Sequence, residues 1–293
     1  MTGTNGVLPV TERAARWREL VPDSVPVAGP DLLVALDIDG TLLTHDGEMS
    51  AEVVSAVADL RDIGAKVVLA TGRSVQAVTP VAARLGLTEG YAVCSNGAVC
   101  VRLDASLDAG YELTDVITFD PGPALRLLRQ ELPEGLFAVE DLGRGYKVTA
   151  PFPMGELTGE VQVVDFEELL AAPATRVTLR APHLDAADFD ALVDRIGLHG
   201  VSYAVGWTAW LDISPEGVTK ASALETLRGR MDVATGSTVA MGDGGNDLEM
   251  LGWAAHGVAM GNAGEHVRAV ADAVTGDVLD DGAAVVLRAL LAR

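Results

Sequence analysis

The sequence is poor in cysteine, with only Cys94 and Cys100 among its 293 residues. Two cysteines can form neither a disulfide framework nor a cysteine-based metal cluster. Both lie in apolar stretches, which is typical of buried, reduced thiols. The sequence therefore excludes a fold that depends on disulfides.

Basic residues are also scarce, because 21 lysines and arginines stand against 42 acidic residues and give a net charge of −21. A protein with such a negative field repels polyanions. We therefore expect no nucleic acid and no membrane among its partners. A small anionic substrate stays compatible with this composition, since it responds to the local charge of its site.

Long apolar runs are absent. The run LLVAL at residues 32–36 is typical, and it is far too short to cross a bilayer. The first twenty residues contain no apolar segment of the kind found in signal peptides. We therefore expect a cytoplasmic protein, and the length predicts about two domains, each able to bury its own core.

The chain alternates between strand and helix patterns from residue 32 onwards. Residues 50–64 are typical of a helix, because Ser50 can cap its start, apolar residues recur at helical spacing and Gly64 follows its end. Strands at 32–36, 66–70 and 91–95 flank helices at 50–64 and 74–86. This order predicts a doubly wound parallel sheet.

The alternation breaks down after residue 101 and resumes near residue 220. The intervening segment has irregularly spaced strand and helix patterns, which indicate an inserted α+β domain. The predicted fold class is therefore α/β, a doubly wound parallel sheet with an inserted α+β domain. The predicted organisation is an N-terminal arm at 1–30, a core at 31–101 and 210–293, and the insert at 102–209.

Two aspartates end the first predicted strand, in the stretch LLVALDIDGTLL. Residues i and i+2 of a strand lie on one face, so Asp37 and Asp39 are expected side by side. Their carboxylates would repel each other there. Either a cation lies between them or one of them carries a proton.

Other predicted strands end in groups that suit a phosphate or a metal ion. Thr71-Gly72-Arg73 follows the second strand, Ser95-Asn96-Gly97 the third, and Asp243 a later one, while Lys220 opens the helix before that later strand. Ligands of open parallel sheets bind beyond the carboxyl ends of the strands. We therefore expect these groups at one edge of the sheet.

The motifs DIDGTL, TGR, VTK and GDGGND resemble, in order, the four motifs of the haloacid dehalogenase-like (HAD) hydrolase superfamily. The insert after SNGA and the phrases ISPEGVTKASAL and GDGGNDLEML are similar to its Cof-type branch, subfamily IIB, which carries a C2-type cap. The resemblance covers residues 31–293. It implies a Rossmann-like core, a cap formed by the insert, and a phosphatase that uses Mg²⁺.

The chemistry of phosphate esters agrees with this resemblance. A carboxylate that attacks an anionic ester is repelled unless a cation such as Mg²⁺ intervenes. Asp37 is then the expected nucleophile, through an aspartyl-phosphate, and Asp39 the expected proton donor and acceptor. The resemblance implies that Asp37, Asp243 and the backbone carbonyl of Asp39 bind the metal.

The remaining candidates bind the phosphate or the rest of the substrate. Thr71 offers a hydroxyl, the amides after it suit a phosphate oxygen, and Lys220 offers a compact positive charge that serves catalysis. Further candidates for phosphate or substrate binding are Gly72, Arg73, Asn96, Asn246 and Asp247.

In the predicted cap, the hairpin VEDLGRGYKV offers Glu140, Arg144 and Lys147 as substrate contacts. The other interpretation of Arg144 is a solvated turn residue.

The preferred hypothesis is a Mg²⁺-dependent phosphomonoester hydrolase for a small soluble phosphometabolite, and the resemblance favours a sugar phosphate. Two alternatives stay open, a phosphomutase of the phosphomannomutase type and a noncatalytic phosphate-binding module. A mutase needs clustered arginines to hold a bisphosphate, and the predicted cap has a modest number of basic residues. The substrate and the oligomeric state are not assigned by the sequence.

Overall fold

The computed structural model describes residues 8–205 and 209–293. The chain divides into two compact units. The first comprises Met1–Leu69, Arg84–Gly90 and Glu225–Arg293, and the second comprises Ala70–Ala83 and Tyr91–Leu224. Each unit is described by itself.

The larger sheet has eight strands in the order β14-β13-β12-β1-β2-β3-β4-β5. Parallel pairing joins β1 to β2 and β12, and joins β13 to β12 and β14. The strands are β1 (Leu33–Leu36), β2 (Lys66–Ala70), β3 (Glu89–Cys94), β4 (Val99–Asp104), β5 (Tyr111–Val116), β12 (Thr238–Gly242), β13 (His256–Ala259) and β14 (Ala273–Val274). This arrangement confirms the predicted α/β class.

One edge of this sheet departs from the parallel pattern. Strand β5 pairs with β4 in an antiparallel manner, with a bulge between Cys100 and Val101. A short connection can join antiparallel neighbours, whereas parallel neighbours need a crossover. The sheet is therefore mixed and mostly parallel.

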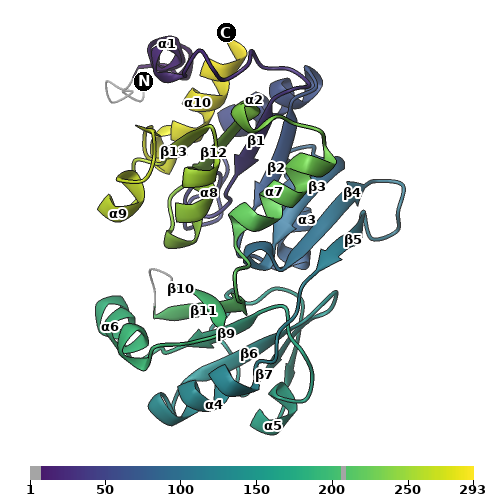
Figure 1. Ribbon diagram of the computed structural model, residues 1–293, viewed down its shortest axis with the longest axis vertical. Helices are drawn as coiled ribbons and strands as arrows, with labels where there is room; N and C mark the ends of the chain where they lie inside the picture. The colour runs from purple at the N-terminus through teal and green to yellow at the C-terminus, as the bar shows by residue number, and fades with distance from the viewer. Residues whose placement is uncertain (1–7, 206–208) are drawn as a thin grey trace, which may run out of the picture. The chain divides into compact units, whose positions relative to one another are not determined.

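The helices of the first unit include those expected from the sequence. Helix α2 (Ala51–Asp62) starts as predicted at Ser50, whose hydroxyl accepts a hydrogen bond from the Val53 amide at 3.1 Å. Helix α10 (Gly282–Leu291) is apolar and almost wholly buried, and it lies beside α2 and beside α1 (Val10–Trp17) (Figure 1). The unit also contains α8 (Leu248–Trp253), α9 (Glu265–Arg268) and the short 3-10 helices Arg18–Leu20, Thr235–Ser237, Gly245–Asp247 and Val278–Asp280.

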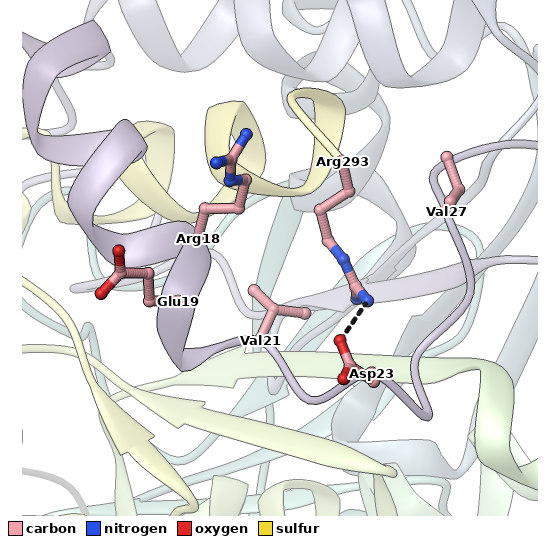
Figure 2. A pocket seen from close by; sticks show the side chains of 6 residues that line it. All are labelled: Arg18, Glu19, Val21, Asp23, Val27 and Arg293. Atoms are coloured by element: carbon pink, nitrogen blue, oxygen red, sulfur yellow. Dashed lines mark ion pairs between the residues drawn. The ribbon is translucent and has the colours of Figure 1, made fainter.

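The N-terminal arm is fastened to the C-terminal part of the first unit. Arg13 donates a hydrogen bond to the Asp280 carbonyl at 2.6 Å, and Arg293 donates one to the Val25 carbonyl at 2.9 Å. A cavity of about 420 Å³ lies here, and Arg293 and Asp23 form an ion pair in its lining (Figure 2). Its lining contains none of the predicted site residues.

The second unit contains a six-stranded sheet in the order β10-β11-β9-β6-β7-β8. Its pairs are antiparallel except β7 with β8. The strands are β6 (Leu136–Asp141), β7 (Gly145–Val148), β8 (Glu160–Val163), β9 (Val177–Arg180), β10 (Val201–Val205) and β11 (Trp210–Pro215). This second sheet forms the cap.

Helices cover one face of the cap sheet (Figure 1). Leu125 and Leu128 of α4 (Gly122–Glu131) and Phe189 of α6 (Ala186–Ile196) share one buried apolar cluster with Phe137 and Leu179 of the sheet. The second unit also contains α3 (Val75–Arg84, whose last residue belongs to the first unit), α5 (Phe166–Leu169), the 3-10 turn Ser95–Gly97 and α7 (Lys220–Arg230, which continues into the first unit). This packing gives the cap its own core.

Strand pairing shows to which sheet the segments near the predicted boundaries at 102 and 210 belong, and the boundaries themselves stay a prediction. Strand β5 keeps residues up to Val116 in the larger sheet, and β11 keeps residues up to Pro215 in the cap sheet. Cross-strand pairing, which the linear pattern does not display, decides to which sheet each strand belongs.

Within the described part of the chain, no helix is both long and apolar enough to cross a membrane.

Candidate active site

Three carboxylates gather at one end of the larger sheet in the first unit. Oxygen atoms of Asp37, Asp243 and Asp247 all lie within 4.8 Å of one another. Asp37 directly follows β1 and Asp243 directly follows β12, and these two strands are parallel neighbours. Pairing continues one residue further, because the Asp37 amide donates to the Met241 carbonyl at 3.0 Å. The topology therefore brings Asp37 and Asp243 to the same sheet edge.

The backbone at Gly40 makes room for Asp243. A Cβ at Gly40, whose φ is +76°, would lie 2.2 Å from Oδ2 of Asp243. Thr41 donates its hydroxyl to Oδ1 of Asp243 at 3.4 Å. Any larger residue at position 40 would displace this carboxylate, and the positive φ would strain it as well.

Asn262 belongs to this site and was missed by the sequence analysis. Its amide nitrogen donates to Oδ2 of Asp243 at 3.1 Å and to the Gly40 carbonyl at 2.9 Å. Its own oxygen accepts from the Val278 amide at 3.0 Å. The available signal was its place just after β13, because the rule about strand ends applies to that strand too.

Asp247 fixes the loop that carries Asp243. Its side chain is fully buried, and Oδ2 accepts the amides of Asp243 at 3.0 Å and Gly244 at 2.9 Å. Three carboxylates this close repel one another by about a few kcal/mol per pair at intermediate dielectric. Hard oxygen ligands in such a group suit a divalent cation such as Mg²⁺. The donor set therefore fits a metal site.

Asp39 differs from Asp37 in its surroundings. Strand β1 ends at Leu36, so strand alternation does not extend to Asp39. Asp37 is buried, whereas Asp39 is exposed and its carboxylate is not in the acidic group. The predicted contact of its carbonyl with a metal stays a prediction. Asn246, in the turn Gly245–Asp247, is partly exposed.

A second group of predicted residues lies in the second unit. Thr71 is buried, and its hydroxyl accepts the Arg73 amide at 3.1 Å. The Asn96 amide donates to the Thr71 carbonyl at 3.0 Å, and the Ser95 amide donates to the Arg73 carbonyl at 2.8 Å. The two motifs that follow β2 and β3 are therefore bonded to each other.

The turn Ser95–Gly97 also contacts the segment before Lys220. A Cβ on Gly97, whose φ is +104°, would lie 2.2 Å from the Thr219 carbonyl oxygen. Lys220 is the next residue, begins α7 and is buried. A Cβ on Gly72 would lie 3.1 Å from Oδ1 of Asn96. Thr71, Gly72, Arg73, Asn96 and Lys220 are thus gathered around one turn.

The cap candidates have three different environments. Glu140 is buried, and its Oε2 accepts the hydroxyls of Ser95 at 2.7 Å and Thr175 at 2.8 Å. Lys147 forms an ion pair with Glu168 at 2.8 Å. Arg144 is exposed in the turn between β6 and β7, which pair as the predicted hairpin.

The two cysteines are buried free thiols, as expected. Burial raises the pKa of the Cys94 thiol, and the neighbouring Glu140 and Cys100 raise it further. A thiol whose pKa is raised is a poor nucleophile at neutral pH, because the thiolate is the reactive form. Cys94 is therefore not a candidate for covalent catalysis.

The family model of the haloacid dehalogenase-like hydrolases matches residues 34–111 and 156–287. The chain belongs to this family. It is 28% identical to the pyridoxal phosphate phosphatase YbhA of Escherichia coli (strain K12) over 270 residues, which are 86% of this chain and 96% of the relative. It is also 28% identical to the HMP-PP phosphatase of Serratia proteamaculans (strain 568) over 235 residues, 79% of this chain and 84% of the relative.

The fold matches that of the HAD subclass IIB sugar phosphatase BT4131, with a TM-score of 0.72 and 23% identity over 86% of this chain and 96% of that structure. This likeness supports the predicted arrangement of a core sheet and a cap with its own sheet. The protein is a HAD-family phosphatase.

Proposed function

We propose that this HAD phosphatase is a Mg²⁺-dependent phosphomonoesterase for a small phosphometabolite, with Asp37 as its nucleophile. The observation that carries the proposal is the acidic group, in which buried Asp37 lies beside Asp243 and Asp247 at the end of β1. The relatives named for pyridoxal phosphate and HMP-PP support a small phosphorylated substrate. The sugar phosphate expected from the family resemblance belongs to the same class.

The proposed reaction has two steps. In the first, a carboxylate oxygen of Asp37 bonds to the phosphorus, the ester bond to the leaving oxygen breaks, and Asp39 donates a proton to that oxygen. In the second, Asp39 takes a proton from water, the water oxygen attacks phosphorus, and the bond to Asp37 breaks. The exposed position of Asp39 supports this role, because a carboxyl in contact with solvent can exchange its proton freely.

Asp37, Asp243 and Asp247 would hold the metal ion through oxygen atoms, together with the Asp39 carbonyl predicted from the family. When bound, Mg²⁺ neutralises the charge that would otherwise keep an anionic ester away from Asp37. Asn262 and Thr41 serve this group by orienting the Asp243 carboxylate.

The phosphate group itself is assigned to Thr71, the amides of Gly72 and Arg73, Asn96 and Lys220, with Asn246 as a further contact. The hydroxyl of Thr71 and the charge of Lys220 both suit a phosphate oxygen. The bonds among the TGR and SNG segments support a common role for them.

The cap favours hydrolysis over phosphoryl transfer to a second sugar site. Arg176 is paired with Asp212 at 2.7 Å, Arg180 with Glu156 at 3.3 Å, and Lys147 with Glu168 at 2.8 Å. Arg144, unlike these three cations, has no ion pair within the described ranges, residues 8–205 and 209–293. One such cation is a poor match for the second phosphate of a bisphosphate, and it suits one further anionic or hydroxyl-rich part of a substrate.

The test is a phosphatase screen of the purified protein. Pyridoxal 5′-phosphate, sugar phosphates, other phosphorylated metabolites and p-nitrophenyl phosphate are each assayed with Mg²⁺ and with excess EDTA. The proposal predicts phosphate release from at least one small metabolite, with Mg²⁺ required. Release that persists unchanged in EDTA, or no release from any member of the panel, would contradict it.

A further inference from the structure

The turn Ser95–Asn96–Gly97 has an unfavourable backbone. Ser95 and Asn96 have φ values of +48° and +53°, and Gly97 has +104°. Two consecutive non-glycine residues in the left-handed region are strained, and such residues persist only where their surroundings hold them. Something outside the turn must therefore supply the restraint.

Two backbone bonds supply part of it. The amides of Ser95 and Asn96 donate to the carbonyls of Arg73 and Thr71, at 2.8 and 3.0 Å. These bonds tie the turn to the TGR segment, but that segment is itself a loop. The Thr71 amide in turn donates to the Val93 carbonyl of β3 at 3.0 Å, so these bonds anchor the backbone of the turn to a strand and leave the Ser95 side chain for another partner.

Glu140 is the partner of the Ser95 side chain and connects the turn to a second strand. It lies in β6, between β7 and β9 of the cap sheet, and its amide donates to the Arg176 carbonyl at 3.0 Å. Its carboxylate oxygen Oε2 accepts the Ser95 hydroxyl at 2.7 Å and the Thr175 hydroxyl at 2.8 Å. A side chain of a central strand is thus hydrogen-bonded to the first residue of the strained turn, which lies 45 residues away in the sequence.

The surroundings of Glu140 are unsuited to a substrate contact. The residue is only 6% exposed, and Oε2 is already occupied by two donors. Its other oxygen, Oε1, is buried and has no hydrogen-bond partner among the described residues. A buried carboxylate oxygen without a hydrogen bond destabilises the folded protein, and the two hydrogen bonds from Ser95 and Thr175 to Oε2 offset this destabilisation.

We propose that Glu140 is a positioning residue, whose carboxylate holds the turn Ser95–Gly97 so that Asn96 and Gly97 lie against the Thr71 and Thr219 segments. The inference rests on the proposed function insofar as Thr71, Asn96 and Lys220 bind the phosphate. It departs from the expectation that Glu140 accepts substrate hydroxyls. Its consequence is that Glu140 affects the hydrolysis of every phosphoester, including one too small to reach the cap.

The experiment compares Glu140→Ala and Glu140→Gln, with Asp141→Ala as the matched control. Asp141 is the neighbouring carboxylate of β6 and accepts no hydrogen bond from Ser95. We expect Glu140→Ala to lower kcat for p-nitrophenyl phosphate by about 10- to 100-fold, the scale of a small misplacement of binding groups. Glu140→Gln keeps an oxygen acceptor for both hydroxyls and should stay within about threefold of wild type, as should Asp141→Ala.

A second readout does not depend on phosphatase activity. In Glu140→Ala, hydrogen–deuterium exchange of the Ser95 and Asn96 amides should accelerate at least about tenfold, because their hydrogen bonds open more often. If the wild-type protein hydrolyses no phosphoester, the proposed function fails, yet this exchange still tests the role of Glu140.

Ser95→Ala guards against a variant that simply folds poorly. If Glu140 acts through Ser95, the double variant Ser95→Ala/Glu140→Ala should lose no more kcat than Glu140→Ala alone, because the two residues share one interaction. Three outcomes would overturn the inference. They are unchanged exchange at Ser95 and Asn96, losses that multiply in the double variant, and a KM effect confined to large substrates with wild-type kcat on p-nitrophenyl phosphate.

Discussion

The acidic group of the first unit and the Ser95–Gly97 turn of the second solve opposite electrostatic problems. Asp37, Asp243 and Asp247 bring like charges within 4.8 Å of one another. The turn instead presents hydroxyls and amides, and the Glu140 carboxylate accepts its Ser95 hydroxyl. The first region could hold an external cation, whereas the second is held by hydrogen bonds within the protein.

This difference indicates which changes should disrupt each region. The acidic group is held by short-range features, because Asp247 binds amides three and four residues away. The turn depends on more distant residues, because it is bonded to the TGR segment and to Glu140, which lies 45 positions away. We expect metal removal and charge changes to disable the acidic group, and changes in the cap sheet to disable the turn.

The largest expected effect breaks the acidic group at its nucleophile. Asp37→Asn should abolish turnover with the fold intact, a loss of at least about a thousandfold, because the amide cannot form the phosphoryl-enzyme. Asp39→Asn should slow turnover severely and leave the binding of inorganic phosphate in place. Steady-state kinetics with p-nitrophenyl phosphate and circular dichroism check both, and a tenth of the wild-type rate in Asp37→Asn would rule out the covalent route.

A smaller effect is expected at the loop that carries Asp243. Asp247→Ala removes the acceptor of two amides and should lower kcat by about 10- to 100-fold and also lower the melting temperature. Asp247→Asn keeps an acceptor and should recover the melting temperature but not all of kcat, because the charge is lost. Equal kcat in both variants and wild type would exclude Asp247 from the acidic site.

Features of the two regions that depend on residues close together in the sequence were predicted, whereas those that depend on residues far apart were not. The Ser50 cap, the strand ends at Asp37 and Asp243, and the joint placement of Thr71 and Asn96 depend on local patterns and were predicted. The burial of Glu140 was not, because it depends on Ser95 and Thr175, which lie 45 and 35 residues away.

Strands β8 and β11 were not predicted from the sequence, for a related reason. Strand β8 is exposed along its whole length, so no apolar alternation marks it. Strand β11 includes Asp212, a charged residue that is unusual in a strand and that here forms an ion pair with buried Arg176 at 2.7 Å. Both strands are defined by partners that the linear pattern does not reveal.

A further prediction concerns substrate binding by Arg144, in the exposed turn between β6 and β7. Arg144→Ala should raise KM for the physiological substrate about tenfold, the worth of one charge-assisted contact, and leave p-nitrophenyl phosphate turnover unchanged. Lys147→Ala is the matched control, because its charge is already paired with Glu168. Identical kinetics of Arg144→Ala and wild type on both substrates would make Arg144 an ordinary surface residue.

The smallest expected effect is on stability and concerns His256, which belongs to neither of the two compared regions. Burial lowers the pKa of His256, although Asp272 opposes the shift. The histidine of the unfolded chain, with a pKa of about 6.5, therefore binds a proton more readily than His256 of the folded protein. The free energy of unfolding keeps the full contribution of His256 above that pH. Below it, this contribution falls by at most about 1.4 kcal/mol per pH unit.

The melting temperature measured between pH 5 and 8 checks this. His256→Phe should flatten the pH dependence near pH 6, and His266→Phe, at an exposed position, should leave it unchanged. A wild-type curve that rises towards acid pH would contradict the assignment.

The most direct test of the central claim is calorimetric titration of Mg²⁺ into the wild-type protein, Asp243→Asn and Glu249→Gln. Glu249 is an exposed acid on the neighbouring helix and serves as the control. The account predicts one Mg²⁺ bound per wild-type chain, unchanged affinity in Glu249→Gln, and at least about tenfold weaker binding in Asp243→Asn, since one charged ligand is lost. Equal affinity in all three proteins, or no binding to the wild type, would contradict it.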